Sequence, residues 1–176
     1  QGVLLTIAVD ALRDLPPAEL AAQAAVLRRR LDALGELLQI ECPVYLVLTR
    51  ADQMHGFAAS FEDLDAAGAG QVWGATLPLR GRESTAAGAQ VLAEFDALYA
   101  LLCERRVGRL TREASPERRS DIYLFPLELR ALRERLASFV DALCAPDPFG
   151  RRPLLRGFYL TSAAQAGPSR ETVLTE

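Results

Sequence analysis

Apolar residues along the chain form two kinds of pattern. Short continuous runs are typical of buried strands, and residues at helical spacing are typical of helices. Val3–Val9 and Val44–Leu48 are apolar almost throughout, which predicts strands buried on both faces of a parallel sheet. Leu154–Leu160 predicts a last strand, and Ile122–Phe125 a short one. Val72–Leu77 predicts a weaker extended segment closed by Pro78.

Helical spacing of apolar residues separates these strands. A helix after Pro16-Pro17 places Leu20, Ala24, Leu27, Leu31, Leu34 and Leu38 on one stripe. A short helix carries Phe57, Phe61 and Leu64, a long one spans 89–112, and another starts at Pro126. Strands that alternate with helices predict an α/β fold with a mostly parallel sheet and flanking helices.

Ligands of open α/β sheets bind at the carboxyl ends of the strands, so the residues just past each strand are the candidates for a site. Asp10 follows the first strand, and Thr49-Arg50-Ala51-Asp52 ends the second. The latter resembles the [NT]KxD motif of GTPases, in which the aspartate accepts two hydrogen bonds from guanine. Arg50 stands where lysine is usual and can stack on a base. The alternative is that Asp52 caps the following helix.

Guanine sites also use a loop whose backbone N–H groups reach the base oxygen. Thr161-Ser162-Ala163 after the last strand resembles such a loop, and Phe125-Pro126 competes with it by position. Pro126 would lack one backbone donor. The sequence leaves both candidates open.

The phosphate-binding half of a nucleotide site is missing from the 176 residues. No GxxxxGK[ST] loop occurs, and all 20 basic residues are arginine. With no catalytic or metal-ligating residue predicted, we expect no nucleotide hydrolysis by this chain. His55 is the single histidine, which argues against His-based metal sites and Ser-His-Asp triads.

Composition narrows the class of protein further. The length suits one domain, half of the residues are hydrophobic, and the net charge of −3 gives no sign of a nucleic-acid partner. The three scattered cysteines indicate reduced thiols rather than disulfides. No apolar run reaches the roughly 18 residues that span a bilayer. Because Gln1 directly precedes a predicted buried strand, we expect the chain to be a piece of a longer protein.

Two charged clusters have an ordinary and a functional interpretation. The basic run of Arg105, Arg106, Arg109 and Arg112 on the long helix is a solvated face paired with Glu104 and Glu113, or a surface for a partner or anionic lipid. Glu62, Asp63 and Asp65 are interpreted as a solvated helix face. Trp73 is interpreted as a packing residue.

Several blocks, in order and over nearly the whole chain, resemble the TssM/IcmF family of type VI secretion proteins. The blocks are Gly2–Ile7, Cys42–Asp52, Gly56-Phe57, Phe61–Leu64, Gln71–Gly74, Phe95–Leu98, Ile122–Pro126 and Pro153–Ser162. The chain departs from the family pattern at Arg50, where lysine is usual, and at Ala59-Ser60, where aromatic residues are common.

The resemblance implies part of a GTPase-like, P-loop-NTPase-like cytoplasmic domain. Residues 1–166 would be its C-terminal portion with a helical insertion at about 89–113, and residues 167–176 a flexible tail. It also implies the cytoplasmic face of the Gram-negative inner membrane, and the partners TssL (DotU-like), baseplate proteins and, through the periplasmic part of the parent, TssJ. We expect no cofactor in this chain; GTP or ATP is a possible cofactor of the full-length protein. In this chain Thr49, Arg50, Asp52, Thr161 and Ser162 are the candidate base-binding residues.

Overall fold

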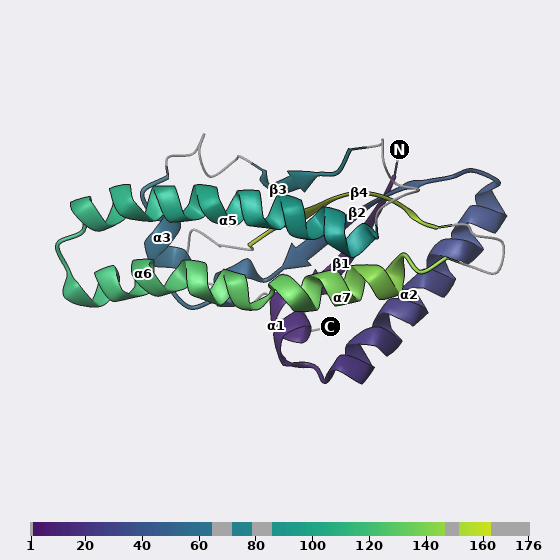
Figure 1. Ribbon diagram of the computed structural model, residues 1–176, viewed down its shortest axis with the longest axis horizontal. Coiled ribbons are helices and arrows are strands. Elements are labelled where there is room, and N and C mark those ends of the chain that lie inside the picture. Colours follow the sequence, from purple (N-terminus) through teal and green to yellow (C-terminus); the bar gives the residue numbers. More distant parts are fainter. Residues whose placement is uncertain (1, 65–71, 79–85, 147–151, 163–176) are drawn as a thin grey trace, which may run out of the picture.

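The computed structural model describes residues 2–64, 72–78, 86–146 and 152–162 (Figure 1). The predicted tail at 167–176, Ala163 and Asp65 lie outside these residues. In chain order the elements are β1 (Val3–Ala8), α1 (Val9–Asp14), α2 (Pro17–Leu38), β2 (Pro43–Thr49), the 3₁₀ helix η1 (Ala51–Gln53), α3 (Phe57–Phe61), β3 (Trp73–Thr76), α5 (Ala87–Arg112), α6 (Pro116–Ala131), α7 (Arg133–Leu143) and β4 (Leu154–Leu160).

The strands form one mixed sheet in the order β1-β2-β4-β3. β1, β2 and β4 run parallel, with Val3 opposite Val44 and Leu46 opposite Phe158. β3 pairs antiparallel to β4 at the edge. The predicted α/β class is therefore confirmed, with an antiparallel edge strand added to a parallel sheet.

The hydrophobic core lies on one face of the sheet. Leu5, Leu46 and Phe158 on that face are at most 5% exposed, under the layer that contains α5 and α7 (Figure 1). On the other face Leu4 is 70% exposed and Tyr45 and Tyr159 are half-buried. The prediction that β1 is buried on both faces is wrong for this chain, because its residues alternate between covered and uncovered positions despite their uniform apolarity.

The segment 122–125 is helical, not a strand. Ser115 caps the N-terminus of α6 by accepting a hydrogen bond from the Arg118 backbone N–H at 3.4 Å, and Pro116 occupies the first turn. Ile122, Phe125 and Leu129 then fall on one buried face. The helix continues through Pro126, which sequence reasoning had taken as a helix start.

The long helix α5 confirms the predicted 89–112 helix, two residues longer at its start. Gly88 lies against α7 so closely that a Cβ would come within 2.5 Å of the Asp141 carboxylate, which accepts a hydrogen bond from the Gly88 N–H at 2.8 Å. Asp141 thereby fixes where α5 starts. Among the described residues, no helix is both long enough and apolar enough to cross a membrane.

Candidate functional site

The carboxyl ends of β1, β2 and β4 bring three of the predicted loops together. Asp10, in the first turn of α1, accepts a hydrogen bond from Arg50 at 2.8 Å between Oδ2 and Nη1. The Arg50 side chain is 55% exposed and the Asp10 side chain 34%. Asp10 Oδ1 is buried and has no hydrogen-bond partner in the part of the chain that the structure describes.

Arg50 turns the chain at the end of β2. Its φ of 62° places it in the left-handed region, which non-glycine residues adopt at a cost of about 1–3 kcal/mol. The turn directs the Arg50 side chain toward Asp10 and starts the 3₁₀ helix that contains Asp52. Thr49 Oγ1 lies 3.5 Å from the Ile7 carbonyl oxygen, so it bonds to β1 rather than pointing outward.

Asp52 does not cap the helix that follows it. Gly56 occupies the N-cap position of α3 with a φ of 77°, and no side chain caps it. Asp52 Oδ2 accepts a hydrogen bond from Gln53 Nε2 at 3.0 Å, and Oδ1 is buried without a partner among the described residues. The carboxylate therefore keeps an oxygen that the local fold does not satisfy, which is uncommon for a buried polar atom.

The loop after β4 reaches the Asp52 turn. Ala51 N–H donates to the Thr161 carbonyl oxygen at 3.0 Å, and Thr161 N–H donates to the Leu48 carbonyl oxygen at 2.8 Å. Ser162 follows at this edge of the sheet and is half-buried. The competing candidate is wrong, because Phe125 and Pro126 are buried inside α6.

This arrangement can offer a planar ligand two carboxylates and one guanidinium, while the N–H and carbonyl groups of Thr161 already bond to Leu48 and Ala51. It offers no lysine for phosphate groups. Within the described ranges no group of three or more His, Cys, Asp and Glu side chains is placed to hold a metal ion. His55 lies nearby on the surface, 56% exposed, with Nε2 at 3.1 Å from Asp121 Oδ1.

A second polar cluster joins α3 to α5 and α6, and sequence reasoning missed it. Arg109 is only 8% exposed; it donates to the Ala59 carbonyl oxygen at 2.7 Å and to Glu62 Oε1 at 3.2 Å. Arg105 pairs with Asp63, and Arg118 with Glu62. Glu62 and Asp63, interpreted from sequence as a solvated face, thus neutralise two arginines of the predicted basic run.

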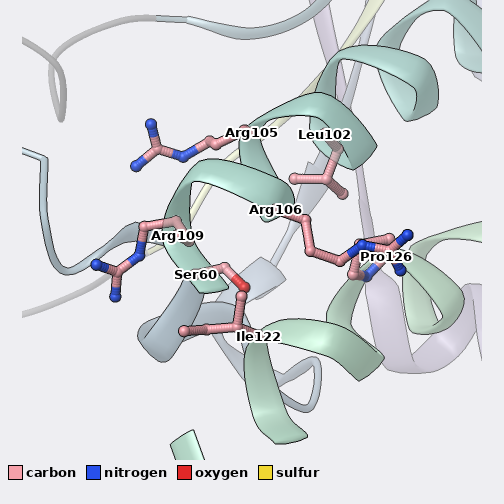
Figure 2. Close-up of a pocket in the computed structure, with 7 residues that line it drawn as sticks. All are labelled: Ser60, Leu102, Arg105, Arg106, Arg109, Ile122 and Pro126. Atoms are coloured by element: carbon pink, nitrogen blue, oxygen red, sulfur yellow. The ribbon is translucent and has the colours of Figure 1, made fainter. Parts of the chain in front are cut away.

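Figure 2 shows how the basic run divides. Arg105 and Arg109 extend to one side of α5, while Arg106 extends toward Pro126 of α6. The stems of these arginines and Ser60, Leu102 and Ile122 line a small hollow. It is mostly apolar and only about the size of one water, so it is too small to bind a ligand.

An aromatic cluster holds α3 against α6 and β3. Trp73 lies 4.8 Å from Phe61 and 5.8 Å from Phe125, measured between ring centroids. Gly56 lets α3 approach, because a Cβ there would come within 2.2 Å of the Asp121 carbonyl oxygen. Trp73 is a packing residue, as its sequence context indicates.

Comparisons with known proteins identify the family. The family model for the IcmF-related N-terminal domain matches residues 1–176. A curated relative, type VI secretion system component TssM1 from Pseudomonas aeruginosa, is 39% identical over 170 residues, which cover 94% of this chain and 15% of the relative. No solved structure matches the chain. The chain accordingly belongs to the TssM/IcmF family of type VI secretion components, as an IcmF-related N-terminal domain.

Proposed function

We propose that this chain is a structural and interaction module of the type VI secretion membrane complex. It forms part of the cytoplasmic domain of a TssM/IcmF-like parent, helps to anchor the apparatus at the inner membrane, and contacts TssL and baseplate proteins. TssJ meets the periplasmic part of the same parent. The observation that carries the proposal is the similarity to TssM1 over 94% of the chain. The chain spans about 15% of that relative. The role and the partners of the whole parent protein are therefore proposed as well.

The candidate base site supports a module that needs no nucleotide. Arg50, the residue that would lie over a base, is paired with Asp10 at 2.8 Å. With no lysine in the chain, the usual phosphate-binding side chain is absent from it. The two features favour a scaffold role, within the GTPase-like, P-loop-NTPase-like fold that we propose from the family resemblance.

The alternative is a nucleotide-dependent switch, in which the parent supplies a phosphate loop and binds GTP or ATP. Oδ1 of Asp52, buried and without a partner among the described residues, favours it, since a base that opened this turn would supply the missing donor. An exposed ion pair contributes only about 0.2–1 kcal/mol, so a base would displace Arg50 from Asp10 at little cost. Thr49, Arg50, Asp52, Thr161 and Ser162 are the residues proposed to surround that base.

Asp52→Ala in the full-length protein separates the two functions. We expect the variant and the wild type to capture TssL equally in a pull-down without nucleotide, and fluorescent GTP titrations to show no binding that Asp52→Ala removes. Asp14→Ala is the matched control, because that carboxylate is exposed and bonds to Arg13 rather than to a residue of the site. TssL capture that requires GTP and is lost in Asp52→Ala alone would replace the scaffold by the switch.

A further inference from the structure

The outer seam between α5 and the α6–α7 segment is lined by arginines in a regular order. α5 and the α6–α7 segment run side by side in opposite directions (Figure 1). Arg133 holds Asp96 through two hydrogen bonds of 2.7 and 2.6 Å. Further along, the Arg130 guanidinium lies 5.6 Å from the centroid of the Tyr99 ring.

Toward the C-terminal end of α5 the same kind of contact recurs, but here the arginine belongs to α5 and the tyrosine to α6. Arg106 of α5 lies 4.9 Å from the centroid of the Tyr123 ring of α6, and its Nη1 donates to the Tyr123 carbonyl oxygen at 3.3 Å. Arg106 points away from the cluster that binds Arg105 and Arg109 (Figure 2). It is therefore the half-buried member of the basic run that lies on the α6 side of α5.

The seam follows a heptad pattern. Its α5 residues step by three and four positions, and the opposing residues step back along α7 and α6 by the same numbers. The stripe on α5 is Asp96, Tyr99, Cys103 and Arg106, opposite Arg133, Arg130, Pro126 and Tyr123. Residues spaced by three and four positions lie on one face of a helix, so these two stripes define the two sides of the seam.

The chemistry of the seam is cationic with an apolar floor. Tyr123 is 53% exposed and Leu127 is 44% exposed, and exposed Val107 borders them on α5. Asp96 is bonded by Arg133, which holds the pKa of that carboxyl below its usual range. Arg106 and Arg130 lie over tyrosine rings, and the N–H groups that do not bond within the chain can bind a carboxylate in two-point fashion.

We propose that this seam, defined as the surface of Tyr99, Arg106, Tyr123, Leu127 and Arg130, docks an acidic amphipathic helix of a partner protein. Carboxylates of the partner meet Arg106 and Arg130, and its apolar side chains cover Tyr123 and Leu127. The inference rests on the proposed function as an interaction module and names the surface and the chemistry of the partner.

The spacing favours a helix over a lipid surface. Tyr99 and Arg106 are seven residues apart on α5, or about 10.5 Å along its axis, which equals two turns of a helix laid beside it. Acidic residues seven positions apart on the partner would therefore meet both arginines. A bilayer has no such repeat, and it would attract the exposed Arg29 and Arg30 of α2 as readily.

The test uses a designed peptide probe of about three heptads, with leucine at the core positions and glutamate beside them. Fluorescence anisotropy measures its binding to the 176-residue chain. We expect R106E/R130E to weaken binding about tenfold or more, and binding to weaken as salt is added. R29E/R30E is the matched control, because it reverses two exposed arginines elsewhere and should leave binding unchanged.

A second variant protects the test against loss of folding. Leu127→Glu leaves both arginines in place, adds a negative charge at a 44% exposed position, and should also abolish peptide binding while circular dichroism shows the wild-type helix content. A peptide of the same composition in scrambled order should bind at least tenfold more weakly than the ordered one.

Three results would overturn the docking proposal: equal loss of binding in R106E/R130E and R29E/R30E, equal binding of the scrambled peptide, or binding to phosphatidylglycerol vesicles in preference to the peptide. The proposed function is tested separately, by measuring TssL capture by the full-length protein. If R106E/R130E still captures TssL as the wild type does, and still binds the peptide, the docking proposal is refuted and the proposed module function stands. Absence of capture by the wild type refutes the module itself.

Discussion

At the scale of single residues, Arg109 is the charged side chain on which the attachment of α3 most depends. Its guanidinium is buried against Ala59, Glu62 and Glu113. We expect Arg109→Leu to lower the free energy of unfolding by about 1–3 kcal/mol, because it leaves the Ala59 carbonyl oxygen without its donor, while Glu62 and Asp63 keep Arg118 and Arg105. Urea denaturation followed by circular dichroism measures the change.

Arg112→Leu provides the comparison, since Arg112 is an exposed arginine one turn further along α5. A surface substitution of this kind changes stability by about 0.5 kcal/mol or less. Equal effects of the two substitutions would mean that Arg109 is solvated and that the cluster with Glu62 contributes nothing.

The two candidate sites differ in how visible they are in the sequence. Thr49, Arg50 and Asp52 are recognisable because a short local motif follows a strand, and the structure places them beside Asp10 and Thr161 as that position predicts. Their role in binding a base stays a prediction. The pairing of Arg109 with Glu62 joins residues 47 positions apart, and nothing in the local pattern distinguishes it from a solvated helix face.

At the scale of elements, the side chains of β1 point alternately to the covered face of the sheet and to the open one. Leu5 is 5% exposed and Leu4 70% exposed in the same strand. We expect Leu5→Ala to cost about 2–5 kcal/mol of unfolding free energy, through lost burial and a cavity. Leu4→Ala should cost about 0.5 kcal/mol or less, since the side chain is already in solvent.

Thermal and urea unfolding of the two variants of this chain give the comparison directly, because the substitutions are chemically identical. A loss at Leu4 as large as that at Leu5 would show that the second face is covered in solution. The open face carries Tyr45 and Tyr159, whose ring centroids are 6.3 Å apart, so a covered state would protect both rings as well.

Strands and helices were unequally predictable at this scale. β1, β2 and β4 follow from apolar runs and α5 from a long stretch of helical spacing, and the structure confirms them. The strand predicted at 122–125 fails because four apolar residues fit either period, and the N-cap at Ser115 decides for a helix. The stripe of α2 is right in period, yet Leu34 and Leu38 are 38% and 50% exposed because the described helix layer does not extend over that end.

At the scale of the whole molecule, arginines connect the N-terminal helices to α7, more than a hundred residues away. Arg28 of α2 donates to the Leu143 carbonyl oxygen at 3.4 Å and to that of Ala145. Arg135 of α7 donates to the Leu12 carbonyl oxygen at 2.6 Å and to that of Leu15. These bonds satisfy carbonyl groups at the ends of α1 and α7, where helices leave them without partners. In a chain without lysine, the planar guanidinium is well suited to bridge two carbonyls at once.

This arrangement predicts that Arg135→Ala opens the N-terminal helices without unfolding the sheet. Hydrogen bonds from a charged donor contribute about 1.5–3 kcal/mol, so amide hydrogen exchange in α1 and the first turn of α2 should accelerate about tenfold or more. β2 and β4 should keep their protection, because they form the buried centre of the sheet. Arg133→Ala is the control within the same helix, since Arg133 bonds to Asp96 of α5 and touches neither Leu12 nor Leu15. Exchange that accelerates equally in the sheet and in α1 would show that the molecule opens as a single cooperative unit, and that Arg135 stabilises the fold as a whole rather than the docking of its N-terminal helices.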